Sequence, residues 1–220
     1  MVEHNTSPHR SNSTAFVLFL LFLAIYFVGC STASNNKSHE VRFFPDQALE
    51  VAVKRAVKLN STDVLSTEYL QNITKLNARN LGITNISGIE NLENLKYLYL
   101  SENEIQDIGP ISSLTNLRYL YLSGNQIEDI SSIQNLNGLR VLFLRDNQIR
   151  DITPISDLEN IGVIYLRNNL ITDISPLVEN ASLTEVWIWL EGNPLSDTSI
   201  TRDIPLLKKR LVQVSYSPRR

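Results

Sequence analysis

The side chains that most hydrolases and zinc proteins depend on are nearly absent from this sequence. Its 220 residues include one cysteine and three histidines, and all four lie at or before residue 39: His4, His9, Cys30 and His39. The rest of the chain therefore cannot form a Cys/His zinc site, a Ser-His-Asp triad or a Cys-His dyad. The 8 glycines are scattered and form no phosphate-binding loop. We expect a protein that is not an enzyme and has no catalytic residue, metal site or cofactor.

A surplus of basic charge is also lacking. Lys and Arg number 20, Asp and Glu number 23, and the formal net charge is −3. Proteins that bind nucleic acids neutralise phosphates with an excess of Lys and Arg, so this composition argues against a nucleic-acid partner. Once the N-terminal segment described next is set apart, about 180 residues remain, which is the size of a single domain.

The N-terminus carries one long apolar run. Ala15 to Gly29 reads AFVLFLLFLAIYFVG, without a charge, and the polar stretch STASNNKSHE follows Cys30 directly. As a helix the run would be about 22 Å long against a hydrocarbon core of about 30 Å, which favours a signal peptide, with a signal anchor as the alternative. Phe27-Val28-Gly29-Cys30 resembles the lipobox of bacterial lipoproteins. The resemblance implies lipidation of Cys30, and an ordinary signal whose last residue is cysteine is the alternative.

A period of 22 residues organises the chain after residue 70. One apolar column repeats without interruption at Ile73, Leu95, Leu117, Leu139, Ile161 and Leu183. The combined pattern L-x-x-L-x-L-x-x-N-x-I is the leucine-rich-repeat signature, in which each repeat supplies one short strand and a tight return segment. We therefore predict an α/β fold, namely a right-handed leucine-rich-repeat solenoid whose parallel strands form a concave sheet.

Two polar columns follow the same period and are interpreted as structural. The amides of Asn103, Asn125, Asn147 and Asn169 can satisfy backbone groups of the turn that leaves each strand. The carboxylates of Asp107, Asp129, Asp151 and Asp173 are expected to accept hydrogen bonds from nearby backbone N–H groups. A row of metal ligands or of acid/base groups is the less favoured interpretation of these carboxylates.

The repeat length and the D-I-x-P-I turn resemble the internalin type of bacterial leucine-rich repeat. The resemblance covers about residues 43–216, because Phe44-Pro45-Asp46 is similar to the start of the helical N-terminal cap of such domains and Gly192-Asn193-Pro194 to their exit. No C-terminal wall-sorting motif is present, so we expect anchoring through Cys30. We assign residues 1–29 to a signal peptide, 30–42 to a tether, 43–72 to the N-terminal helical cap, 73–195 to the repeats and 196–220 to a C-terminal cap and tail.

Both caps are predicted from a change of pattern, because a solenoid must cover its open ends. At the front, the apolar residues of a helix that starts at Pro45-Asp46 recur at helical spacing: Leu49, Val53, Ala56 and Val57. At the back, Asn193 comes 24 residues after Asn169, so the last strand has gained two residues. A helical stretch and a closing strand are expected beyond Ser196.

The residue between the two inward leucines of each strand is expected to point to the concave surface. That column contains Tyr99, Tyr121, Phe143, Tyr165 and, in the shifted last strand, Trp187 or Trp189, and Tyr97 and Tyr119 lie in the column beside it. Arg145 and Arg167 follow in the next column and add positive charge. Tyr, Trp and Arg are enriched at interface hot spots, so we assign these ten residues to a partner-binding face. The alternative is that the aromatic residues only stiffen the sheet.

The sequence therefore predicts a monomeric, exported binding protein on the cell envelope or cell surface. The expected partner is an extracellular or envelope protein or peptide with acidic residues. A carbohydrate is the second choice, since sugars also stack on aromatic rings, and a regulatory subunit of an enzyme is the third.

Overall fold

A computed structural model describes residues 43–217, which lie within one compact unit, residues 42–220. The predicted signal peptide, Cys30 and the tether lie outside the described residues. Among the residues that are described, no helix is long and apolar enough to cross a membrane.

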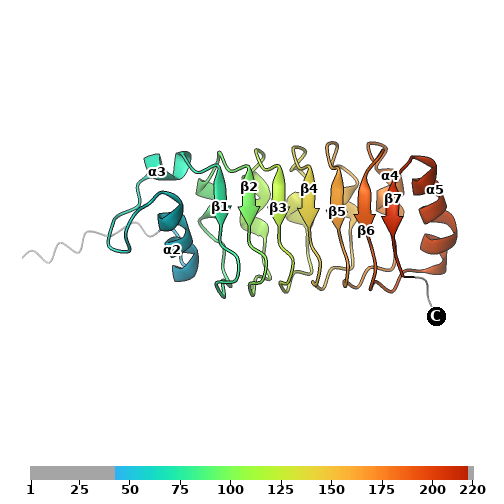
Figure 1. The fold of residues 1–220 in the computed structure, drawn as a ribbon, viewed down its shortest axis with the longest axis horizontal. Coiled ribbons are helices and arrows are strands. Elements are labelled where there is room, and N and C mark those ends of the chain that lie inside the picture. The colour runs from blue at the N-terminus through green and yellow to red at the C-terminus, as the bar shows by residue number, and fades with distance from the viewer. Residues whose placement is uncertain (1–42, 218–220) are drawn as a thin grey trace, which may run out of the picture. The chain divides into compact units, whose positions relative to one another are not determined.

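A short strand and a short helical turn alternate along the chain to form a solenoid (Figure 1). The strands are β1 (Lys75–Asn77), β2 (Tyr97–Tyr99), β3 (Tyr119–Tyr121), β4 (Val141–Phe143), β5 (Val163–Tyr165), β6 (Trp187–Trp189) and β7 (Gln213–Ser215). The return segments from β1 to β6 hold the 3-10 turns η1 (Ile89–Asn91), η2 (Gly109–Ser113), η3 (Ser131–Ile133) and η4 (Thr153–Ile155) and the helix α4 (Ser175–Glu179). A π-helical turn, η5 (Ser199–Asp203), and the helix α5 (Ile204–Lys209) precede β7.

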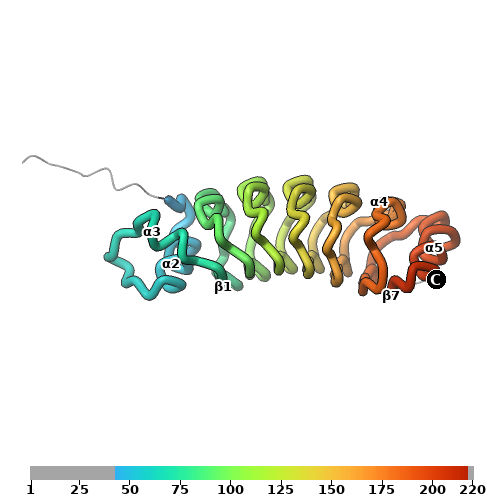
Figure 2. The backbone as a smooth tube through the Cα atoms, turned by 90° about the horizontal axis from the view of Figure 1, so that it is seen from above, coloured from blue at the N-terminus to red at the C-terminus, as the bar shows by residue number. Residues whose placement is uncertain are grey.

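The seven strands pair in chain order as one parallel sheet. From β1 to β5 each residue pairs with the residue 22 positions on, as Leu76 with Leu98 and Leu142 with Ile164. Between β5 and β6 the spacing grows to 24, and Tyr165 pairs with Trp189. The strands line the inner side of a curve and the helical turns its outer side (Figure 2). The predicted α/β leucine-rich-repeat solenoid is therefore confirmed.

The core is one continuous apolar column between the sheet and the helical turns. Leu98 and Leu100 of the second repeat are fully buried, whereas Tyr99 between them and Tyr97 before them point outward. The next three repeats follow the same alternation, because a strand sends successive side chains to opposite faces. Burial of this leucine and isoleucine set holds each repeat against its neighbours.

The N-terminal cap consists of α2 (Gln47–Ala56) and α3 (Thr67–Gln71). One carboxylate oxygen of Asp46 accepts hydrogen bonds from the backbone N–H groups of Ala48 and Leu49, at 2.9 and 3.1 Å, and so starts α2. Its other oxygen accepts from the Thr84 N–H at 3.1 Å. Asp46 thus ties the cap to the first repeat.

The buried side of α2 is made of Leu49, Ala52 and Val53. Ala56 is exposed, in contrast to the sequence-based expectation, because α2 ends there and the larger Val57 packs against the core in its place. At the other end of the solenoid, Ile204 and Leu207 of α5 and Val212 before β7 are buried over the last repeat.

Candidate binding face

Two columns of side chains on the exposed surface of the sheet make up the candidate site, which we call the binding face. Register aligns the first column as Asn77, Tyr99, Tyr121, Phe143, Tyr165 and Trp189. The second column is Lys75, Tyr97, Tyr119, Val141, Val163 and Trp187. The sequence left open which tryptophan continues the first column, and the longer spacing before β6 places Trp189 there. All eight aromatic residues assigned from the sequence lie on this one face.

The rings of the first column stack on one another along the sheet. Their centroids are 4.7 Å apart for Tyr99 and Tyr121, and 4.8, 4.4 and 4.0 Å apart for the pairs that follow up to Trp189. The interplanar angles are between 13° and 28°. We call these five stacked rings, Tyr99 to Trp189, the ladder. In the second column Tyr97 and Tyr119 stack in the same way, with centroids 4.6 Å apart.

Stacking determines which part of each ring meets solvent. A ring inside the ladder has both of its faces covered by its neighbours, so it presents its edge, and each of these rings is accordingly half-buried. Trp187 differs, because 52% of it is exposed. Its indole lies 5.8 Å from that of Trp189, and its partner in β7 is Gln213 rather than another ring. The β6 end is therefore where the face offers a large exposed indole.

Two cations lie at the opposite end of the face, on and just after β1. The Arg79 guanidinium carbon lies 4.1 Å from the centre of the Tyr99 ring and 5.2 Å from that of Tyr121. The Lys75 ammonium lies 5.4 Å from the centre of Tyr99. Both cations thus converge on the first ring of the ladder, at a distance typical of cation–π contacts.

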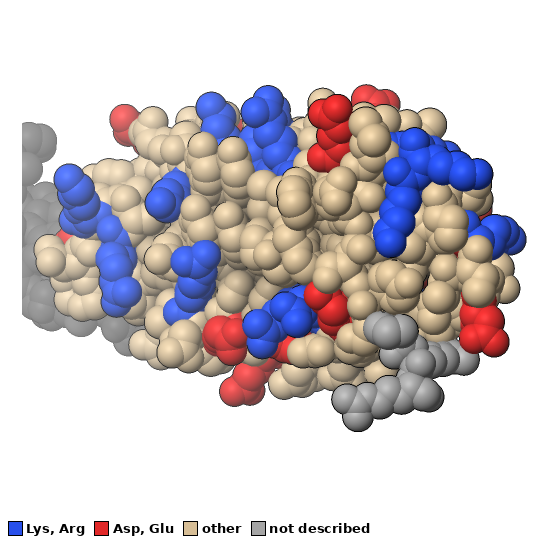
Figure 3. Space-filling model, turned by 45° about the vertical axis from the view of Figure 1, so that its right-hand side comes forward, with Lys and Arg blue, Asp and Glu red and all other residues tan. Residues whose placement is uncertain are grey.

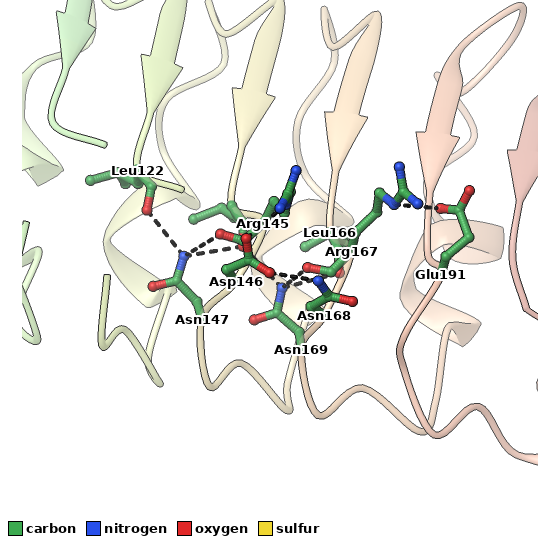
Figure 4. A network of polar contacts seen from close by, with 10 residues as sticks. Leu122, Arg145, Asp146, Asn147, Leu166, Arg167, Asn168, Asn169 and Glu191 are labelled. Carbon is green, nitrogen blue, oxygen red and sulfur yellow. Dashed lines mark hydrogen bonds and ion pairs between the residues drawn. The ribbon is translucent and has the colours of Figure 1, made fainter. Parts of the chain in front are cut away.

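The positive charge of the two arginines assigned from the sequence is compensated by acidic neighbours. Arg145 donates from Nε to Asp146 at 2.7 Å, and the Arg167 Nε lies 3.4 Å from a carboxylate oxygen of Glu191 (Figure 4). Asp146 also accepts from the Asn168 amide at 2.6 Å. The middle of the face is a band without Asp or Glu, and acidic side chains lie toward its margins (Figure 3).

Tyr121 is a ladder residue whose hydroxyl has a shifted pKa. Burial raises the pKa of Tyr121 above its ordinary value of about 10, the nearby Tyr99 and Tyr119 raise it as well, and Arg79 opposes them. The phenol of Tyr121 is therefore a hydrogen-bond donor throughout the physiological pH range.

The two polar columns have the structural roles that the sequence predicts. The Asn147 side chain donates to the carbonyl oxygen of Leu122 at 3.0 Å (Figure 4). It also donates to the carbonyl oxygen of Leu144 at 3.1 Å and accepts from the Ile127 N–H at 3.0 Å. The carboxylates of the aspartate column each accept from the backbone N–H two residues on: Gly109, Ser131, Thr153 and Ser175. In the part of the chain that the structure describes, no three His, Cys, Asp or Glu side chains are placed to hold a metal ion.

Lys75 and Arg79 are face residues that the sequence-based site assignment leaves out. Their column positions were visible in the 22-residue alignment, beside Asn77. The sequence does not show which cations of the face have a carboxylate partner. The structure does, because it pairs Arg145 and Arg167 with carboxylates. Among the described residues neither Lys75 nor Arg79 makes an ion pair.

Comparison with known proteins agrees with the repeat pattern and the fold. The family model for leucine-rich repeats, taken two copies at a time, matches residues 71–113, 93–138, 115–160 and 137–179. The solved structure of internalin C2 from Listeria monocytogenes is 32% identical over a match that covers 80% of this chain and 95% of that chain. The chain belongs to the internalin-type leucine-rich-repeat proteins.

The internalin-type chain is similar to internalin C2 with a TM-score of 0.56. A leucine-rich-repeat protein from Leptospira interrogans is 26% identical, with a TM-score of 0.60, over 69% of this chain and 40% of that one. Internalin F from Listeria monocytogenes is 28% identical, with a TM-score of 0.48, over 80% of this chain and 65% of that one. The chain thus spans nearly all of internalin C2 but less than two thirds of the other two. Among proteins with curated descriptions, none matches it significantly.

Proposed function

We propose that this internalin-type chain is a non-enzymatic binding protein that recognises a protein or peptide through the binding face. The observation that carries the proposal is the unbroken ladder from Tyr99 to Trp189, which continues into the exposed indole of Trp187. Stacked rings make a rigid strip with little side-chain entropy left to lose on binding. Aromatic residues of this kind are enriched at the centres of protein interfaces.

The ladder geometry favours a protein partner over a carbohydrate. Sugars pack their apolar faces on exposed aromatic ring faces, and inside the ladder those faces are covered by neighbouring rings at 4.0 to 4.8 Å. The ring edges and phenol hydroxyls that remain suit the mixed apolar and polar surface of a peptide. Trp187 is the exception, and a sugar that binds there alone would not depend on the ladder.

Selection of random peptides displayed on phage against the full-length protein in mild detergent tests the proposal. Peptides that bind the wild-type protein should lose binding to Phe143→Ala and Tyr121→Ala. The matched control is Tyr69→Ala, which removes an aromatic side chain that is 41% exposed on α3, outside the sheet. Peptides that bind all three variants equally, or no selected peptides at all, would contradict the proposal.

Thermal unfolding of the same variants separates binding from folding. Phe143→Ala removes two stacked pairs, each worth about 0.5–1.5 kcal/mol beyond area burial. We expect a lower Tm with a single cooperative transition, because Phe143 lies outside the core. The loss of binding should therefore be seen well below the Tm of the variant.

The proposed location is the cell envelope, reached through the N-terminal apolar run and Cys30. The support is the sequence pattern Phe27-Val28-Gly29-Cys30 together with the bacterial internalin-type repeats. The intact mass of protein extracted from membranes tests this location. A mature species that begins at Cys30 with a diacylglyceryl-sized adduct is expected, and Cys30→Ser should remove the adduct. An unmodified full-length chain in the membrane would indicate a signal anchor, and a cleaved chain without lipid would indicate secretion.

A further inference from the structure

The free cationic groups of the binding face are concentrated at its β1 end. Arg145 and Arg167, near β4 and β5, lie within 2.7 and 3.4 Å of carboxylates. At the β1 end, the described residues provide no hydrogen-bond acceptor for the three ammonium donors of Lys75 or the five guanidinium donors of Arg79. Both side chains are exposed, and among the described residues their charged groups lie over tyrosine rings and make no hydrogen bond or ion pair.

Four tyrosines line the same end of the face. Tyr97 stacks on Tyr119, and Tyr99 stacks on Tyr121. Each of these rings uses at least one face in stacking, so ring edges and hydroxyl groups make up much of what a ligand meets. An aromatic ring edge carries partial positive charge, and a phenol O–H is a donor. These groups and the two cations therefore favour the same kind of ligand, an oxyanion.

We propose that Lys75, Arg79, Tyr97, Tyr99, Tyr119 and Tyr121 form a subsite that binds a carboxylate side chain of an acidic peptide segment. The inference rests on the proposed function and adds the chemistry of the partner. The Arg79 guanidinium lies over the Tyr99 ring and can make a bidentate contact with a carboxylate, and Lys75 supplies a second charge.

The two ends of the face give the bound peptide a direction. The β6 end has compensated charges and the exposed Trp187, so it suits an apolar or aromatic side chain. Five strand spacings separate β1 from β6, about 24 Å at about 4.8 Å each, which an extended peptide spans with about seven residues. The partner segment is therefore expected to carry an acidic residue and an apolar residue about seven positions apart.

Titration of the full-length protein with poly-L-glutamate at low ionic strength, followed by calorimetry, tests the subsite. Arg79→Gln and Lys75→Gln should each weaken binding by about tenfold, because a hydrogen bond to a charged group is lost. Arg150→Gln is the matched control, since it removes the same exposed side chain from a position after β4 that is outside the binding face. An Arg150→Gln variant that weakens binding as much as Arg79→Gln, or an Arg79→Gln variant that binds normally, would overturn the subsite.

Inorganic phosphate provides a second arm of the same experiment. Phosphate should compete weakly with poly-L-glutamate, since a single small anion lacks the contacts along the tyrosines. If phosphate alone binds more tightly than poly-L-glutamate and with the same dependence on Arg79, the assignment to a carboxylate is wrong and the site is one for phosphate.

The peptides selected by phage display distinguish this inference from the proposed function. Peptides that depend on Phe143 and are enriched in Asp and Glu, with loss of binding to Arg79→Gln, support both. Peptides that depend on Phe143 but show neither acidic enrichment nor dependence on Arg79 would overturn the subsite and leave the binding function intact. Tyr69→Ala should leave all of these peptides bound.

Discussion

At the scale of the residue, one asparagine per repeat provides hydrogen bonds to buried backbone groups that the short strands leave without a partner. Each strand has three residues, so the chain turns away while backbone groups still lie in the core. The buried amide of Asn147 connects three such groups from two repeats, Ile127, Leu122 and Leu144. A buried backbone group without a partner is costly, so the side chain stabilises the turn on both sides.

Replacement of this amide should destabilise the protein strongly. Asn147→Ala leaves the buried Ile127 N–H without a partner, which costs about 1–3 kcal/mol. The carbonyls of Leu122 and Leu144 lose one of their two amide donors and keep the other, from Asn125 and Asn169. We expect a loss of about 1–3 kcal/mol in the free energy of unfolding, measured by urea denaturation. Gln148→Ala, at the exposed neighbouring residue, is the control and should change it by less than about 0.5 kcal/mol. If both variants lost the same free energy of unfolding, the stabilising role proposed for the Asn147 side chain would be wrong.

A second residue-scale feature is a left-handed backbone position three residues after the end of each strand from β1 to β6. It is occupied by Asn80, Glu102, Gly124, Asp146, Asn168 and Gly192, with φ between 53° and 75°. Glycine tolerates this conformation and asparagine and aspartate adopt it more readily than glutamate does. The Gly and Asn residues at this position are a sequence signal for a left-handed backbone, but Glu102 gives no such signal.

The ion pair of Arg145 with Asp146 could not be predicted from the sequence either. Alternation along a strand would send adjacent side chains to opposite faces, and the left-handed backbone at Asp146 brings the two together.

Relief of this strain should stabilise the protein. Glu102→Asn keeps φ near 59° with a residue that accepts it, and we expect a gain of about 0.5–1 kcal/mol in the free energy of unfolding. Glu104→Asn changes the same side chain at an exposed position without positive φ and should bring no gain. Chemical denaturation of both variants measures the difference, and a gain shared by Glu104→Asn would point to surface charge rather than backbone strain.

At the scale of the element, short helical turns replace full helices on the outer side of the solenoid. A turn of three to five residues has little stability of its own. Two residues before η2, η3, η4 and α4, an aspartate compensates by accepting a backbone N–H bond. The D-I-x-P-I pattern was enough to predict these turns, since both Asp and Pro have a defined place at the start of a turn. The stacking of the ladder was not predictable to the same degree, because ring orientation depends on packing between strands.

The turn that contains Asp151 should make stability depend on pH. The Thr153 hydroxyl and then the Thr153 N–H donate to this carboxylate and hold its pKa below the ordinary value. A carboxyl group whose pKa falls on folding stabilises the protein above its unfolded pKa, about 3.9, and the contribution is lost as the pH falls through the folded pKa. Because Asp151 is largely exposed, solvent screening keeps the effect small.

We therefore expect Asp151→Ala to lower Tm at pH 7 and to differ less from the wild-type protein at pH 2. Scanning calorimetry at the two pH values measures the difference. Glu128→Ala serves as the control, because Glu128 is an exposed carboxylate to which no described residue donates a hydrogen bond. A deficit for Asp151→Ala that is the same at both pH values would exclude a role for the ionised carboxylate.

At the scale of the whole molecule, each repeat is stabilised by packing and pairing with the repeats on either side of it. Every strand pairs only with its neighbours in chain order, so each interior repeat is covered on both sides and each end needs a cap. The 22-residue period was sufficient to predict this architecture, since one repeat cannot bury its own apolar face. The details of the caps were less predictable, as Ala56 shows, because a cap occurs once and no repetition reveals its buried positions.

The C-terminal cap provides a test of this coupling through two adjacent leucines of α5. Leu207 is fully buried against the last repeat, whereas Leu206 is 37% exposed. Leu207→Ala should cost about 2–5 kcal/mol, and Leu206→Ala should cost much less because no cavity forms. Hydrogen exchange locates the effect: in Leu207→Ala, protection should fall most in β6 and β7 and least in β1 and β2, since the disturbance must pass through each pairing in turn. Uniform loss across all seven strands would mean that the solenoid unfolds only as one cooperative unit, and the nearest-neighbour account would then be wrong.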